Sequence, residues 1–269
     1  MLCASEKKPQ MNRPELRYLN NAEPYLEHVL AVWEKYFTSG DAFRAFFDSI
    51  SSDEDRNLFL RVGSFYRYLV VEGRFLFKSE EWNRGMSYID DTYKYIAIFS
   101  LIEALDSPGK YIDFYQWLQM KKKGTTLNFG EAPMKVLSRS YQEYKDGHGS
   151  RQAAVRFFSR LDQGDQLLIQ DKLEIHDQKS SIKQLAQLLY DIRSQFVHQA
   201  RLIISFSGTL TVGTVNKKIV INQLSMQDLQ ALFEHGFLKR FEQRRTHNKL
   251  RQSPRRASGA NKSQERKST

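Results

Sequence analysis

Apolar residues recur at three- and four-residue steps in several segments of the chain, which is the period of an amphipathic α-helix. One such segment spans residues 22–37. A second follows Ser51 or Ser52, residue types that cap helix N-termini, and a third spans residues 87–105. Three or four shorter helices are expected between residues 111 and 173. These patterns predict a mainly α-helical protein.

The spacing of apolar residues changes toward the C-terminal end of the chain. Ser180 or Ser181 opens a helix whose apolar stripe continues to Val197. Short β-branched segments then follow, at residues 202–206, 210–214 and 218–221, and they predict a small β-hairpin or three-stranded meander near 202–222. A cap signal at Ser225 starts a last helix, expected to end near residue 245.

Composition divides the chain into four parts. We expect a disordered N-terminus at residues 1–20, an N-terminal helical region at 21–80, a second helical domain at 87–245 and a disordered basic tail at 246–269, where polar residues are mixed with Pro, Gly and Ser. No segment approaches about 18 uninterrupted apolar residues, and the first residues lack the apolar core of a signal peptide. We therefore expect a cytoplasmic protein without a membrane span.

The net charge of +10 is concentrated at one end. Residues 239–269 hold 11 of the 41 Lys and Arg but only two of the 31 Asp and Glu, so this end carries +9 and the rest carries +1. Tail residues such as Arg255 and Arg256 either keep the chain in solution or attract phosphates without sequence preference. The run Lys121, Lys122 and Lys123 either ends a helix favourably or contacts an RNA backbone.

Several reaction classes lack the residues they need. Cys3 is the only cysteine, and no two histidines share a helical three- or four-residue spacing, so we expect no metal site. A glycine-rich phosphate loop with lysine and a Gly-x-Ser-x-Gly motif are both absent. No cofactor is therefore expected.

One segment contains candidate catalytic residues, namely the segment Leu188-Leu-Tyr-Asp-Ile-Arg-Ser-Gln-Phe-Val-His198. Its Arg193 and His198 are separated by four residues, and this phrase resembles the motif of the HEPN superfamily, in particular its Apea-like branch. The earlier phrase Phe99-Ser-Leu-Ile-Glu-Ala-Leu105 resembles the early helix of the same branch. The resemblance covers about residues 87–240, whereas the first 80 residues match no family that we recognise.

The resemblance implies a HEPN-like helical bundle at residues 87–245 that forms a homodimer, with the two motif helices facing each other. It also implies RNA cleavage without metal, by attack of a ribose 2′-hydroxyl on the adjacent phosphate. His198 would remove the hydroxyl proton, because the unperturbed pKa of histidine lies near about 6.5. Arg193 would hold the phosphate and stabilise its growing charge. A site that uses the 2′-hydroxyl would spare DNA.

Three neighbours are candidates for supporting roles. Ser194 would orient the phosphate, Asp191 would orient a histidine across the dimer, and Glu103 would orient Arg193 or another cation. Glu103 also has a plain structural interpretation, as an exposed residue or an ion-pair partner. Members of the branch commonly have glycine after the histidine, whereas this chain has Gln199.

Helix geometry adds a constraint on the motif. Five steps of about 100° place Arg193 and His198 about 140° apart on a regular helix, so they would not share one face. Either a two-fold interface brings Arg193 of one chain toward His198 of the other, or the helix ends near His198 and its side chain turns inward; in both cases we expect a dimeric site.

Two function classes remain. The first is an endoribonuclease that acts as a toxin or phage-defence effector, with an antitoxin or regulatory protein as a candidate partner. The second is a non-catalytic HEPN-like module that binds RNA or a protein.

Overall fold

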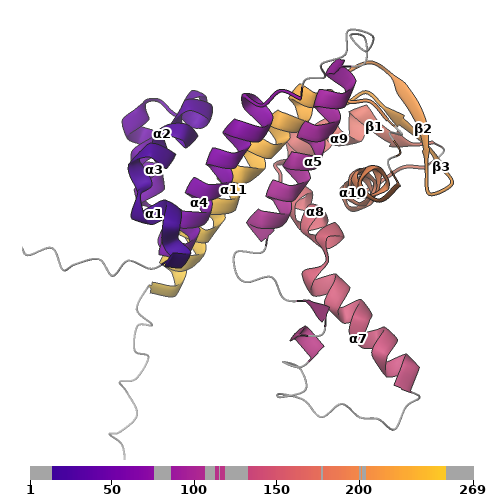
Figure 1. The fold of residues 1–269 in the computed structure, drawn as a ribbon, viewed down its shortest axis with the longest axis horizontal. Helices are drawn as coiled ribbons and strands as arrows, with labels where there is room; N and C mark the ends of the chain where they lie inside the picture. The colour runs from indigo at the N-terminus through magenta and orange to yellow at the C-terminus, as the bar shows by residue number, and fades with distance from the viewer. Residues whose placement is uncertain are drawn as a thin grey trace, which may run out of the picture.

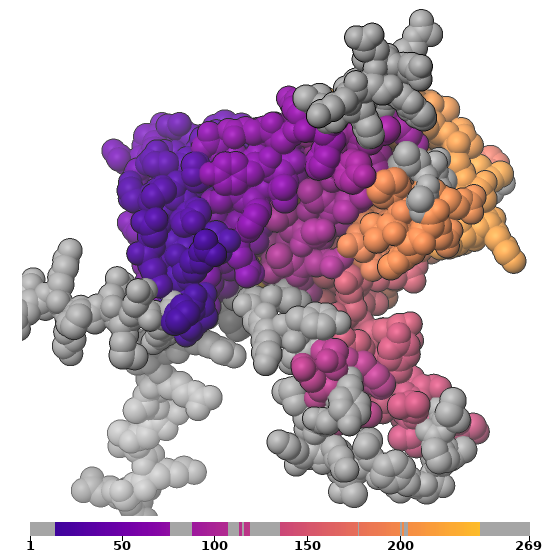
Figure 2. Space-filling view, in the orientation of Figure 1, coloured from indigo at the N-terminus to yellow at the C-terminus, as the bar shows by residue number. Residues whose placement is uncertain are grey.

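The computed structural model describes residues 14–75, 86–106, 113–114, 116–118, 133–176, 178–199, 201 and 204–252. These residues form a mainly helical protein with one small antiparallel sheet, which confirms the predicted fold class. Figure 1 shows short N-terminal helices at one end, long helices in the middle and the sheet at the other end. One helix, α7, projects from the body, as the space-filling view of Figure 2 also shows. None of the described helices is both long and apolar enough to cross a membrane.

The N-terminal part holds four α-helices and a π-helical turn. They are α1 (Arg17–Asn20), α2 (Ala22–Trp33), α3 (Gly40–Asp48), α4 (Asp53–Tyr66) and the turn Arg67–Val71. Ser39 and Ser52 cap α3 and α4 by accepting hydrogen bonds from the backbone N–H groups of Ala42 and Asp55.

Helical structure begins earlier than the sequence predicts. Residues 14–20 were expected to be disordered, but they form a 3-10 turn and α1. The reason is a long-range contact: Leu16 is buried, and Asn57 of α4 accepts hydrogen bonds from the backbone N–H groups of Tyr18 and Leu19. Residues 1–13 lie outside the described part.

The second half contains the longer helices. They are α5 (Met86–Asp106), α7 (Pro133–His148), α8 (Ser150–Ser159), α9 (Gln163–Lys172), α10 (Ile182–Gln199) and α11 (Met226–Gln252). The last helix continues through residues 246–252, which were expected to belong to the disordered tail. Residues 253–269 lie outside the described part.

The sheet differs from the prediction in one strand. Its strands β1 (Leu173–Ile175), β2 (Thr211–Val215) and β3 (Lys218–Asn222) are antiparallel in the order β1-β3-β2. The hairpin β2–β3 was expected, but the third strand comes from residues 173–175, and residues 204–206 form no strand. Side chains hold that segment instead, because the Ser205 carbonyl accepts hydrogen bonds from the Asn222 amide and the Thr211 hydroxyl.

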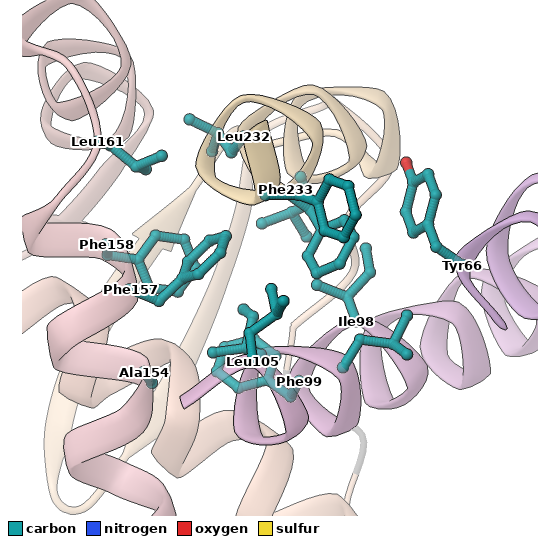
Figure 3. Close-up of a cluster of buried hydrophobic side chains, with 14 of the residues drawn as sticks. Tyr66, Ile98, Phe99, Leu105, Ala154, Phe157, Phe158, Leu161, Leu232 and Phe233 are labelled. Carbon is teal, nitrogen blue, oxygen red and sulfur yellow. The ribbon is translucent and has the colours of Figure 1, made fainter. Parts of the chain in front are cut away.

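The core is continuous across the boundary expected between residues 80 and 87. In Figure 3, side chains of α5, α8 and α11 meet, with Tyr66 of α4 beside Phe233 of α11. One turn further along α11, the ring of Phe237 lies 4.5 Å from that of Trp33 and 4.9 Å from that of Phe59. The N-terminal helices therefore have no separate core.

A buried carboxylate links α11 to the N-terminal helices. Glu234 of α11 is 4 % exposed and accepts hydrogen bonds from the hydroxyls of Tyr36 (2.6 Å) and Tyr66 (2.9 Å), while the Lys35 ammonium lies 2.6 Å away. Burial, reinforced by this carboxylate, raises the pKa of both tyrosines. The phenols therefore remain protonated donors, and Glu234 is satisfied without solvent.

The shared core predicts a large cost for truncating one side chain of α11. Phe237→Ala is expected to lower the free energy of unfolding by about 3–5 kcal/mol, because it leaves a cavity between α11 and the N-terminal helices. Urea denaturation followed by circular dichroism measures this change. The control Leu210→Ala, at a side chain that is 60 % exposed, should change the free energy by no more than about 0.5 kcal/mol. A loss below about 1 kcal/mol for Phe237→Ala would show that the core is not shared.

Candidate active site

Helix α10 carries the Arg193 and His198 motif and begins at a reciprocal cap. The Gln184 side chain accepts hydrogen bonds from the backbone N–H and the hydroxyl of Ser181, and the Ser181 hydroxyl accepts one from the Gln184 N–H. Five apolar residues anchor its buried face, namely Leu185, Ala186, Leu188, Leu189 and Ile192. The helix runs through His198 and ends at Gln199, so it ends near His198, as one of the two expectations has it, and both motif residues lie within it. The angular separation expected between the two motif residues therefore applies.

Arg193 faces α5 and pairs with Glu103. The Arg193 Nη2 atom lies 3.6 Å from Glu103 Oε1, and the two side chains are 16 % and 29 % exposed. The guanidinium also lies 5.8 Å from the centre of the Tyr190 ring. The fold thus brings together the two segments on which the resemblance depends, residues 99–105 and 188–198, although they lie about ninety residues apart in the sequence.

The pair leaves hydrogen-bonding capacity unused. Arg193 Nε and Glu103 Oε1 are both buried and have no hydrogen-bond partner among the described residues. The two groups attract each other as charges, but their nearest atoms lie just beyond hydrogen-bond distance. Buried polar atoms without partners are uncommon in folded proteins and occur at strained or functional positions.

His198 lies on another side of α10. Its side chain is exposed in the last turn of the helix, and within the described part of the chain it has no hydrogen bond or ion pair. Ser194 is half-buried and also forms no side-chain hydrogen bond with the described residues. The structure therefore does not bring Arg193 and His198 together within one chain.

Asp191 is held by groups of its own chain. Its Oδ2 atom accepts hydrogen bonds from Arg151 of α8 (2.8 Å) and from the Asn216 amide at the β2–β3 turn (3.0 Å). Burial raises the pKa of this carboxyl, against the opposing effect of Arg151. Gln195 donates a second hydrogen bond to Asn216, at 3.2 Å. Asp191 thus docks the hairpin and α8 onto the motif helix.

The sequence pattern did not single out Arg151 or Asn216. Asn216 had a local signal, since Asn at a two-residue turn between β-branched segments favours a hairpin. Arg151 had none, because its approach to Asp191 depends on how α8 packs against α10. The proposed phosphate contacts Lys121, Lys122, Lys123, Arg255 and Arg256 all lie outside the described residues.

Exposed apolar side chains flank the Arg193 side of α10. Val197 is 45 % exposed, and Tyr93 of α5 is 40 % exposed. Tyr93 lies edge-on to Phe196, at 6.1 Å between ring centres, and stacks on Phe75 at 4.5 Å. Large apolar side chains exposed together are typical of surfaces that contact another molecule.

Metal-binding groups and hollows away from the motif are two other features that mark functional sites. The described residues contain no group of three or more His, Cys, Asp or Glu that is able to hold a metal ion. A hollow of about 510 Å³ lies between β1 and the first turns of α10, at the end of that helix opposite the motif. Its lining includes Gln170, Glu174 and Lys179.

The chain matches no family model, no curated protein and no solved structure. The case for a site therefore rests on the residues and their geometry.

The ion pair between Arg193 and Glu103 is measurable as a coupling energy. A double-mutant cycle with Arg193→Ala and Glu103→Ala is expected to give about 1 kcal/mol of coupling in the free energy of unfolding, because solvent screens this pair only in part. The matched control is the pair Arg44 and Glu27, whose side chains are 36 % and 52 % exposed and should couple more weakly, because solvent screens this pair more fully. Equal coupling in both cycles would contradict a special role for the partly buried pair.

Proposed function

We propose that this protein is a metal-independent endoribonuclease of the HEPN type, with a site formed by two copies of the chain. The observation that carries the proposal is the approach of Arg193 to Glu103. A guanidinium held by a carboxylate and an aromatic ring is fixed in position yet keeps its charge, as a phosphate-binding group must.

The reaction uses the substrate's own nucleophile. His198 accepts the proton of a ribose 2′-hydroxyl, and the 2′ oxygen attacks the adjacent phosphorus. The bond from phosphorus to the 5′ oxygen breaks, leaving a 2′,3′-cyclic phosphate. The imidazolium then returns the proton to the 5′ oxygen. Arg193 stabilises the charge on the phosphoryl oxygens during attack.

A two-fold dimer overcomes the angular separation on α10. Symmetry presents the same surface twice, so Arg193 of one copy can face His198 of the other. The exposed side chains of Tyr93 and Val197 supply apolar surface beside Arg193 for such a contact. We propose this region as the dimer interface.

The second candidate is a non-catalytic HEPN-like module that binds RNA or a protein. The observation that favours it is the setting of His198, which has no orienting partner among the described residues. A general base without such a partner is less well positioned for proton transfer. RNA or protein binding requires no such base.

A biological setting follows from the resemblance alone. It suggests a cytoplasmic toxin or phage-defence effector, controlled by an antitoxin or another regulatory protein.

Cleavage assays separate the two candidates. Purified protein with mixed RNA and a chelator is expected to cleave RNA and leave single-stranded DNA intact, because only RNA carries the 2′-hydroxyl. His198→Ala should lower the rate by at least about 100-fold while the protein stays folded by circular dichroism. Gel analysis of labelled RNA measures both. Absence of cleavage by the wild-type chain, or full activity of His198→Ala, would rule out the proposed nuclease.

A mixing experiment tests whether the site is shared. Arg193→Ala and His198→Ala are each expected to be inactive, but refolding an equal mixture should restore about one quarter of the wild-type rate. The reason is that about half of the dimers are mixed and each keeps one intact site. Light scattering checks the dimer mass. If mixing restores nothing while dimers form, the two residues do not meet across the interface.

A further inference from the structure

The hairpin β2–β3 turns through two residues that both have left-handed backbone. Val215 pairs with Lys218, so the turn consists of Asn216 at φ 49° and Lys217 at φ 66°. Such turns favour asparagine followed by glycine, because glycine has no Cβ to collide in this region. Lysine occupies the glycine position here, although a side chain is disfavoured there.

This turn is anchored to the motif helix. Asn216 bridges Asp191 and Gln195 of α10 through two hydrogen bonds. His198 follows Asp191 by seven residues, which is about two helical turns, so both lie on nearly the same side of α10. Figure 1 shows the hairpin beside α10, across that helix from α5. The turn therefore adjoins the side of α10 that carries His198, and not the Arg193 side.

The charges at the turn are unbalanced. Lys217 and Lys218 are exposed, and neither ammonium has an ion-pair partner in the described part of the chain. The nearby acid Asp191 is already paired with Arg151, whose own side chain is 48 % exposed. An added anion at the turn would therefore meet two ammonium groups that have no ion-pair partner among the described residues, while Arg151 offsets the charge of the nearest carboxylate.

We propose that the hairpin tip, defined as Asn216, Lys217 and Lys218, holds the phosphodiester backbone of single-stranded RNA next to His198. The inference rests on the proposed function and assigns the RNA contact to the hairpin tip, a group separate from Arg193. Lysine binds phosphate as a point charge, so the contact adds affinity without sequence preference. Asn216 fixes the distance between the tip and α10.

The backbone of Lys217 supports this role independently of charge. Glycine would form the same turn with less strain, so a lysine at this position is unfavourable for folding alone. Strained positions persist where the surrounding structure holds them, and they cluster at binding and active sites. Lys217→Gly is accordingly expected to leave the melting temperature unchanged or raise it by up to about 2 °C, while weakening the interaction with RNA.

Binding measurements with matched variants test the tip. In a His198→Ala background, which prevents cleavage, fluorescence anisotropy of a labelled single-stranded RNA oligonucleotide gives the Kd over a range of salt concentrations. Lys217→Gln removes the charge and keeps the left-handed strain, whereas Lys217→Gly removes both. The control Lys183→Gln removes an exposed lysine from the first turn of α10, at the end opposite the motif.

Each lysine that contacts a phosphate releases about 0.7 of a counterion from single strands, which is about five-fold in affinity near 0.1 M salt. Both Lys217 variants are therefore expected to weaken binding about five-fold and to lower the salt slope by about 0.7, with Lys183→Gln unchanged. Unchanged binding by both Lys217 variants would overturn this inference and leave the proposed function standing. If the wild-type chain neither binds nor cleaves RNA, the proposed function fails together with it.

Discussion

Phe233 and Phe237 of α11 lie between the two halves of the chain. Phe233 stacks on Tyr66 at 4.7 Å and on Phe157 of α8 at 5.9 Å, and one turn later Phe237 meets the rings of Trp33 and Phe59. Arg240 of α11 also donates a hydrogen bond to the Leu105 carbonyl of α5, so α11 is the common support for α4, α5 and α8. The other interactions at the motif depend on it, because α5 and α8 are the helices that present Glu103 and Arg151 to α10.

Helix α10 is thus held from two sides by different kinds of interaction. On the α5 side, the contact of Arg193 with Glu103 is an ion pair with unused hydrogen-bonding capacity. On the hairpin side, Asp191 and Asn216 are joined to each other, to Arg151 and to Gln195 by directed hydrogen bonds of 2.8–3.2 Å. Directed hydrogen bonds fix the position of the groups that form them, whereas a partly satisfied cation is able to accept a new anion. The proposed assignment follows this division, with the phosphate at Arg193 and the structural anchor at Asp191.

Positive charge occurs in two different settings, one at the C-terminal end of the chain and one at the hairpin tip. The excess of positive charge along the chain belongs to residues 239–269, which favours attraction of phosphates in general. The hairpin tip carries only Lys217 and Lys218, but Asn216 places them at a fixed position beside the motif helix. A few charges at a fixed position orient a substrate, whereas a concentrated run of charge raises its local concentration.

The sequence by itself determined the features that depend on local periodicity and turn chemistry. It predicted the helices over residues 87–105 and from 182 onward and the β2–β3 hairpin, because a helix repeats every 3.6 residues wherever it lies and a short turn between β-branched segments forms a hairpin. Tertiary structure decided which distant groups meet. Packing brought Glu103 to Arg193, which the sequence had offered as one of several possible roles for Glu103, and only packing selected residues 173–175 as the third strand, while residues 204–206 form none. Each pairing joins segments far apart in the chain, so its free energy depends on the burial and the partners that the whole fold provides.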